Sequence, residues 1–84
     1  MNLGVFTVTT AGEPQTGSVV YGKTFLIAAT GDNAGNIKIN RLGSASVIEL
    51  AAGERLPLPG PFLHQYEFDC DNDGESFSYI AFDA

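Results

Sequence analysis

The chain has 84 residues, a formal net charge of −6, 44% hydrophobic residues and one cysteine, Cys70. This length fits one small domain with a thin hydrophobic core, and a single cysteine excludes an internal disulfide. The negative charge argues against binding to DNA, RNA or an anionic membrane surface, where basic side chains supply most of the attraction. Because cores of this size are only marginally stable, we expect oligomerisation to add stability, with a bound metal as the second option.

The sequence carries no signal that would direct it to a membrane. No apolar run approaches the roughly 20 residues of a transmembrane helix. The first four residues lack the basic segment and the apolar segment of a signal peptide. We therefore expect the chain to be made and folded in a reducing cytoplasm.

Short strands account for the whole chain. No window of helical length places apolar residues at helical spacing without an interrupting Gly or Pro, whereas β-rich runs between turn residues recur. The predicted strands are 3–10, 18–21, 24–30, 37–42, 46–50, 54–58, 65–70 and 77–82. Segment 18–21 is interpreted as either a short strand or a loop, which leaves seven or eight strands.

The character of the individual strands indicates their positions. Segment 24–30 is strongly apolar and is expected in the middle of a sheet. Pro57 lacks an amide donor, so segment 54–58 is expected at an edge. In segment 65–70, apolar and polar residues alternate, which predicts one buried and one solvated face.

These features together predict an all-β fold. Short strands at a spacing of about 8–12 residues are typical of a β-sandwich, jelly roll or small barrel. We expect one domain over residues 1–84, with an N-terminal strand or arm and a loop over 1–23 and the β-sandwich core over 24–84.

Acidic residues are concentrated near the end of the chain. Six of the ten acidic side chains lie between Glu67 and Asp83, a segment without Lys or Arg. One interpretation is a solvated face that keeps strand edges from pairing with other molecules. The other is a docking surface for a basic partner.

Part of this acidic segment matches the first half of a calcium-binding loop. Residues 69–74 place Asp69, Asp71 and Asp73 at alternate positions before a glycine. The bidentate Glu expected at position 12 of such a loop is Ile80 here, and flanking helices are not predicted, so the segment is not an EF-hand. The alternative is a β-hairpin turn in which residues 72–74 adopt positive φ values. No cofactor is predicted.

Candidate catalytic residues form no recognisable motif. His64 is the only histidine, and no segment provides a nucleophile with a base and an orienting partner. Cys70 alternates with Tyr66 and Phe68 and is expected to be buried rather than reactive. The turn at 32–36 lacks the lysine of a phosphate-binding loop. We therefore predict that the chain is not an enzyme.

Aromatic and apolar residues give the remaining binding candidates. Phe62 and Leu63 follow a proline-rich loop, and each is interpreted as either an exposed interface anchor or a lid folded over the core. Three tyrosines offer rings for stacking on sugars. Two of them also lie in the alternation that builds a core. The tyrosines are Tyr21, Tyr66 and Tyr79.

Four short motifs then occur in an order that resembles a known group of proteins. They are Gly-Asn-Ile at 35–37, Leu-x-x-Gly-Glu at 50–54, Leu-x-Leu at 56–58 and Asp-x-Asp-x-Asp-Gly-Glu-x-x-Ser-Tyr at 69–79. In this order, over residues 24–82, the chain resembles small virion-associated proteins of tailed bacteriophages. Residues 1–23 carry no part of the resemblance.

The resemblance implies a capsid decoration, or cement, protein. Such a protein is a small β-sandwich or jelly roll that forms a homotrimer on the outside of the head and stabilises contacts between major capsid protein subunits. The chain would then be made in the host bacterial cytoplasm and end in the virion. Alternatives are a head–tail joining or tail component, or a calcium- or carbohydrate-binding β-module.

Overall fold

The structure is a computed structural model that describes residues 2–83. Its strands are short, and the chain has no α-helix within that range. They are β1 (Asn2–Thr7), β2 (Gln15–Thr16), β3 (Thr24–Ala29), β4 (Ile37–Arg41), β5 (Ile48–Leu50), β6 (Arg55–Pro59), β7 (Tyr66–Cys70) and β8 (Ser76–Phe82), with one 3₁₀ turn, η1 (Leu63–Gln65), before β7.

The strands pair from the two ends of the chain inward, the first with the last, the second with the seventh, and so on. The pairs β1–β8, β2–β7, β3–β6 and β4–β5 are all antiparallel, so the chain forms one long ribbon that doubles back between β4 and β5. Two further pairings, β3 with β8 and β4 with β7, fold this ribbon into two sheets. The first sheet has the order β1-β8-β3-β6 and the second β2-β7-β4-β5. The predicted β-sandwich is confirmed, with the strand order of a jelly roll.

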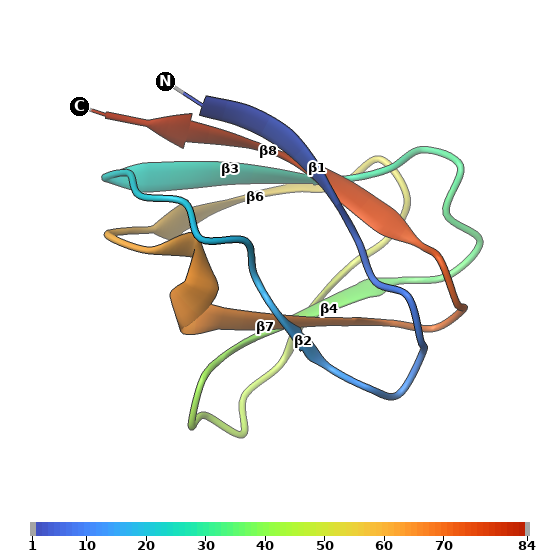
Figure 1. Cartoon of the computed structure of the whole chain (residues 1–84). Helices are drawn as coiled ribbons and strands as arrows, with labels where there is room; N and C mark the ends of the chain where they lie inside the picture. Colours follow the sequence, from blue (N-terminus) through green and yellow to red (C-terminus); the bar gives the residue numbers. More distant parts are fainter. Residues whose placement is uncertain (1, 84) are drawn as a thin grey trace.

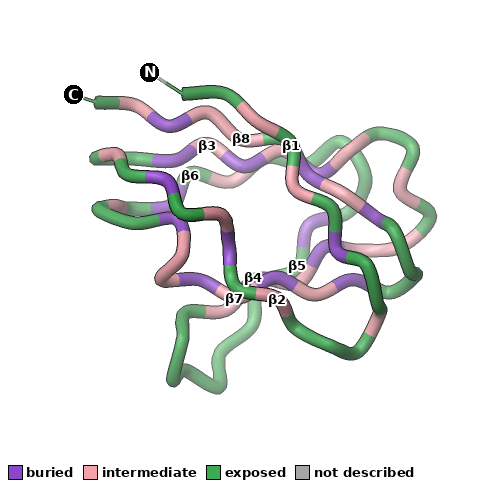
Figure 2. Tube along the Cα trace, viewed as in Figure 1, coloured by how far each residue is buried: buried purple, intermediate pink, exposed green. Residues whose placement is uncertain are grey.

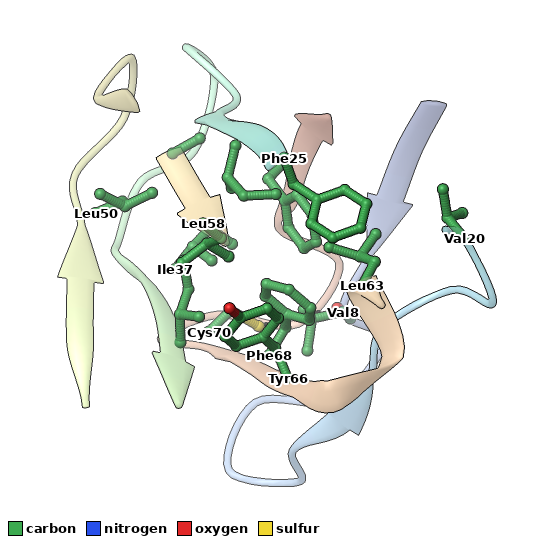
Figure 3. Close-up of a cluster of buried hydrophobic side chains, with 14 of the residues drawn as sticks. Val8, Val20, Phe25, Ile37, Leu50, Leu58, Leu63, Tyr66, Phe68 and Cys70 are labelled. Atoms are coloured by element: carbon green, nitrogen blue, oxygen red, sulfur yellow. Dashed lines mark hydrogen bonds between the residues drawn. The ribbon is translucent and has the colours of Figure 1, made fainter. Parts of the chain in front are cut away.

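The core lies between these two layers (Figure 1). Phe25 and Phe77 of the first sheet and Phe68 of the second are all fully buried. The ring centroids of Phe68 and Phe77 are 4.4 Å apart, so the two sheets meet directly at this pair. Figure 3 shows Phe25 and Leu58 packing toward Phe68 and Tyr66 across the same space. β3 lies inside its sheet and β6 at the edge, as predicted from their sequences.

The ribbon bends where it passes from one sheet to the other. Val8, directly after β1, donates its amide hydrogen to the carbonyl oxygen of Glu75 at 2.9 Å, and the amide of Gly74 donates to the Val8 carbonyl at 2.8 Å. The two arms therefore stay paired through the bend. Val8 and Val20 are buried, so segment 1–23 contributes side chains to the same core.

The structure differs from the expected elements at two places. The first is a short strand within the loop expected over part of 1–23, while segment 18–21 takes the loop interpretation and not the strand. β2 occupies Gln15–Thr16, whereas Ser18, Val19 and Val20 form no strand and Tyr21 makes only an isolated bridge to Phe62. The reason lies at Gly17, which donates its amide to the Tyr66 carbonyl at 3.0 Å. Beyond this point the chain crosses from the second sheet to the first. Residues 18–21 therefore do not run alongside a strand of either sheet, and their β-propensity alone does not make them a strand.

The acidic turn is the second difference. β7 and β8 belong to different sheets, so residues 71–75 connect the two layers and do not close a hairpin. Gly74 has a φ of 82°, and within residues 2–83 only glycines have positive φ. The expectation that Asn72 and Asp73 share this conformation is therefore wrong. A layer crossing needs one sharp change of direction, which Gly74 provides.

Candidate binding surface

The two sheets present opposite kinds of outer surface. On β3, Phe25 and Ile27 face the core, so Leu26 and Ala28 face outward because side chains alternate along a strand. Strand register carries this outward row across the first sheet, placing Leu26 beside Ile80 and Ile80 beside Leu3. The outward positions of this sheet are Leu3, Val5, Thr7, Ser76, Ser78, Ile80, Phe82, Thr24, Leu26, Ala28, Arg55, Pro57 and Pro59. We call this surface the apolar face.

The apolar face is almost free of charge. Of its positions, only Arg55 carries a charged side chain. Leu3 and Val5 are 70% and 69% exposed, at the side of the sheet that β1 forms. Figure 2 shows exposed and intermediate residues along β1, and two buried residues among intermediate and exposed ones along β8. Exposed apolar side chains that adjoin one another in this way mark interaction surfaces on soluble proteins.

The outer surface of the second sheet is polar. Its outward positions are Thr16, Lys38, Asn40, Glu49, Glu67 and Asp69. Lys38 stands opposite Glu49 on one side and opposite Asp69 on the other. This sheet thus shows the apolar-in and polar-out alternation of a sheet with one solvated face. In the first sheet, by contrast, eight of the thirteen outward positions are apolar.

The three aspartates of the calcium prediction bind donors of the chain itself. Asp69 accepts the amide hydrogens of Gly12 and Cys70 at 2.9 and 2.8 Å, and Asp73 accepts that of Ala11 at 2.7 Å. Asp71 accepts from the Asn36 amide at 2.7 Å and forms an ion pair with Lys38 at 3.0 Å. Within residues 2–83, no group of three or more His, Cys, Asp or Glu side chains is placed to hold a metal ion. The geometry therefore favours a turn held by the chain's own donors over a calcium loop, although this turn crosses between the sheets and closes no hairpin.

These contacts also shift the titration of two charged groups. The amide of Asn36, followed by the ammonium of Lys38, lowers the pKa of Asp71 below its ordinary value. The hydrogen bond and the charge of Asp71 raise the pKa of Lys38. Both side chains are partly exposed, so this pair organises the loop without adding much to the free energy of folding.

Glu75 is the buried acid of the segment, with only 6% of its surface exposed. Its carboxylate accepts the amide hydrogens of Gly35 at 2.6 Å and of Asn72 at 3.0 Å. Burial alone raises the pKa of this carboxyl, but these hydrogen bonds outweigh burial and lower it. Glu75 was not singled out from the sequence, although it directly follows the turn glycine.

Phe62 and Leu63 have separate roles. Leu63 is 0% exposed and packs into the core, so the interpretation of Leu63 as an exposed interface residue is wrong. The cause is η1, which turns Leu63 inward and leaves Phe62 outside. Phe62 is 38% exposed and its ring lies 5.4 Å from Tyr21 and 5.0 Å from His64, measured between centroids. These rings form a small aromatic cluster at the end of the sandwich.

The other candidate residues serve the core. Cys70 is buried as predicted, and burial is the main reason why its thiol pKa is raised. Tyr66 is buried and donates its hydroxyl to the Pro59 carbonyl at 2.7 Å. The ring of Tyr79 lies over Gly4 in the paired strand β1, where a Cβ would overlap with it. Of the three tyrosines, Tyr21 is thus the one with a largely exposed ring.

Comparisons with known proteins add no relative. No family model matches the chain, and no match was found among curated proteins or among solved structures. No helix within residues 2–83 has the length and apolar character needed to cross a bilayer.

Proposed function

We propose that this chain is a structural protein of a tailed-phage virion, acting as a capsid decoration protein that binds and does no chemistry. It would sit on the outside of the head and stabilise contacts between major capsid protein subunits. The observation that carries this proposal is the difference between the apolar face of the first sheet and the acidic outer face of the second. One face suits contact with protein, and the other suits solvent.

The arrangement of the two faces fits a protein that coats a particle. Burial of the apolar face against other chains would supply stability that a small core lacks. The polar face, with Glu49, Glu67 and Asp69, would point to solvent and keep densely packed copies soluble. The order of the four sequence motifs over residues 24–82 supports the same assignment by resemblance.

The test is co-sedimentation with expanded, DNA-free heads assembled from the major capsid protein of the same genome. The proposal predicts that the purified protein pellets with these heads and raises the temperature at which they fall apart. A genome without a capsid gene, or heads that pellet without the protein, would refute the proposal.

Two variants test whether the apolar face makes the contact with the heads. Leu26→Glu adds one charge to the middle of the apolar face and is expected to abolish pelleting while leaving the isolated fold intact, because Leu26 faces away from the core. Ala52→Glu adds the same charge at an exposed turn and is expected to pellet like the unmodified protein. Equal pelleting by both variants would show that the apolar face is not the contact.

A further inference from the structure

The sandwich has four sheet edges, and three of them are poorly suited to pair with another strand. β6 carries Pro57 and Pro59, which lack amide donors. β2 has two residues and β5 has three. Very short strands and edge prolines are devices that prevent sheets from joining edge to edge.

The fourth edge, β1, has none of these protections. It runs over six residues, Asn2–Thr7, without a proline or a charged side chain. Among the strands of residues 2–83 it pairs with β8 alone, so its other side is unpaired. Such an edge is a template for an additional strand.

The hydrogen-bond pattern shows which residues of β1 are available. Hydrogen-bonded and non-hydrogen-bonded pairs alternate along an antiparallel ladder. The Val8 amide donates to the Glu75 carbonyl, on the side of β8 that faces β1. The Thr30 amide donates to the Ser76 carbonyl, on the side of β8 that faces β3. By alternation, even-numbered residues of β1 bond to β8, whereas Leu3, Val5 and Thr7 direct their amide and carbonyl groups toward the open edge.

The same residues belong to the apolar face. Leu3 and Val5 are the two exposed large hydrophobic side chains in the strands of the first sheet. An added strand would therefore gain backbone hydrogen bonds and reduce the exposure of Leu3 and Val5 at once. Figure 1 shows β1 as the outermost strand of its layer, beside β8.

We propose that a second copy of this chain pairs with β1, antiparallel and about a twofold axis through Val5. In this register Val5 stands opposite Val5 of the second copy, and Leu3 stands opposite Thr7. The two four-stranded sheets would join into one, and their apolar faces would form one continuous surface. A twofold contact is self-complementary, because each copy gives and receives the same bonds.

The net charge of −6 does not oppose a second copy at this edge. β1 carries no charge, and the acidic outward residues Glu49, Glu67 and Asp69 lie on the other sheet. Two copies can thus meet along β1 without placing like charges opposite each other. The pairing does not depend on the proposed place of the protein in a virion, and it differs from the trimer that the resemblance implies.

Amide hydrogen exchange tests the pairing residue by residue. In the assembled protein, we expect the amides of Leu3, Val5 and Thr7 to exchange as slowly as those of Gly4 and Phe6, which bond to β8 in either state. A free edge would give fast exchange at Leu3, Val5 and Thr7 beside slow exchange at Gly4 and Phe6. That alternating pattern at high protein concentration would overturn the proposal.

A charge on the edge provides the second test. Val5→Lys is expected to convert the dimer to a monomer without loss of the fold, since Val5 faces outward. Val19→Lys is the matched control, because Val19 is similarly exposed, at 73%, and lies outside β1. We expect Val19→Lys to remain a dimer. A dimer in both variants, a monomer in both, or a trimer in the unmodified protein would overturn the twofold pairing.

Discussion

Glu75 and Gly35 link two loops that are 40 residues apart in the sequence. The Glu75 carboxylate accepts the Gly35 amide hydrogen at 2.6 Å, which ties the loop before β8 to the loop between β3 and β4. Asn33 adds to the link, because its side chain donates to the Ser76 carbonyl at 2.8 Å and accepts the Ser76 amide hydrogen at 3.1 Å. One end of the sandwich is thus closed by polar contacts and not by apolar packing.

Replacing the buried acid should change the pH dependence of stability. The folded-state pKa of Glu75 lies below its ordinary value of 4.5, so its contribution to the free energy of unfolding is complete above pH 4.5 and is lost as pH falls through the folded-state pKa. Glu75→Gln should cost about 1–3 kcal/mol at pH 7 and flatten the fall in Tm below pH 4.5.

The matched control for this charge change is Glu13→Gln, since Glu13 is exposed in the loop between β1 and β2. Thermal unfolding from pH 7 to pH 3 should leave the control close to the unmodified protein. Equal curves for both variants would mean that the Glu75 carboxylate does not stabilise the loops.

The core pair of Phe68 and Phe77 gives a second prediction. Phe68 is fully buried and its ring centroid lies 5.6 Å from that of Phe6 as well. Phe68→Ala should leave a cavity between the sheets and destabilise the fold by about 3–5 kcal/mol. Urea unfolding measures this loss, and Phe62→Ala, at a partly exposed ring, should cost much less. Similar urea midpoints for the two variants would contradict the position of the core.

The turn glycine gives a third prediction. Gly74 has a φ of 82°, whereas Gly31 has no neighbouring atom within 4 Å of an added Cβ and no positive φ. Gly74→Ala should cost about 1–2 kcal/mol, because the left-handed conformation strains any residue with a Cβ. Gly31→Ala should be near neutral in the same Tm measurement. Loss of stability in Gly31→Ala alone would contradict the assigned turn.

Metal removal gives a fourth prediction. Because the carboxylates of Asp69, Asp71 and Asp73 accept hydrogen bonds from the chain itself, EDTA should leave Tm unchanged and added calcium should not raise it. Asp73→Ala should cost about 1 kcal/mol through the lost contact with the Ala11 amide. A clear rise of Tm with millimolar calcium would restore the calcium interpretation.

Patterns within single strands made much of the fold predictable. The apolar run 24–30 and the alternation in 65–70 indicate β3 and β7. A strand buried on both faces is a continuous apolar run, and a strand buried on one face alternates apolar and polar residues. Pro57 indicates an edge strand because proline lacks the amide donor that a central strand needs, and this is known from the residue alone. The buried state of Cys70 follows from the same alternation.

Relationships between strands were not predictable. The sequence around Gly74 suits a hairpin as well as a crossing between sheets, and only the pairing of β7 and β8 with other strands separates the two. Leu63 is buried because η1 rotates it, which no apolar pattern indicates. The apolar face did leave a signal in β3, where Leu26 and Ala28 alternate with buried residues and make the strand apolar on both sides. Its meaning depends on knowing that nothing within residues 2–83 covers that side of the sheet.

The molecular mass in solution, measured by light scattering over a dilution series with and without EDTA, tests the central claim most directly. The claim is that a second copy joins at the β1 edge and extends the first sheet and its apolar face. We predict a mass of two times 8.9 kDa that does not change with EDTA. A mass of 8.9 kDa at every concentration would contradict self-association, and three times 8.9 kDa would contradict the twofold contact.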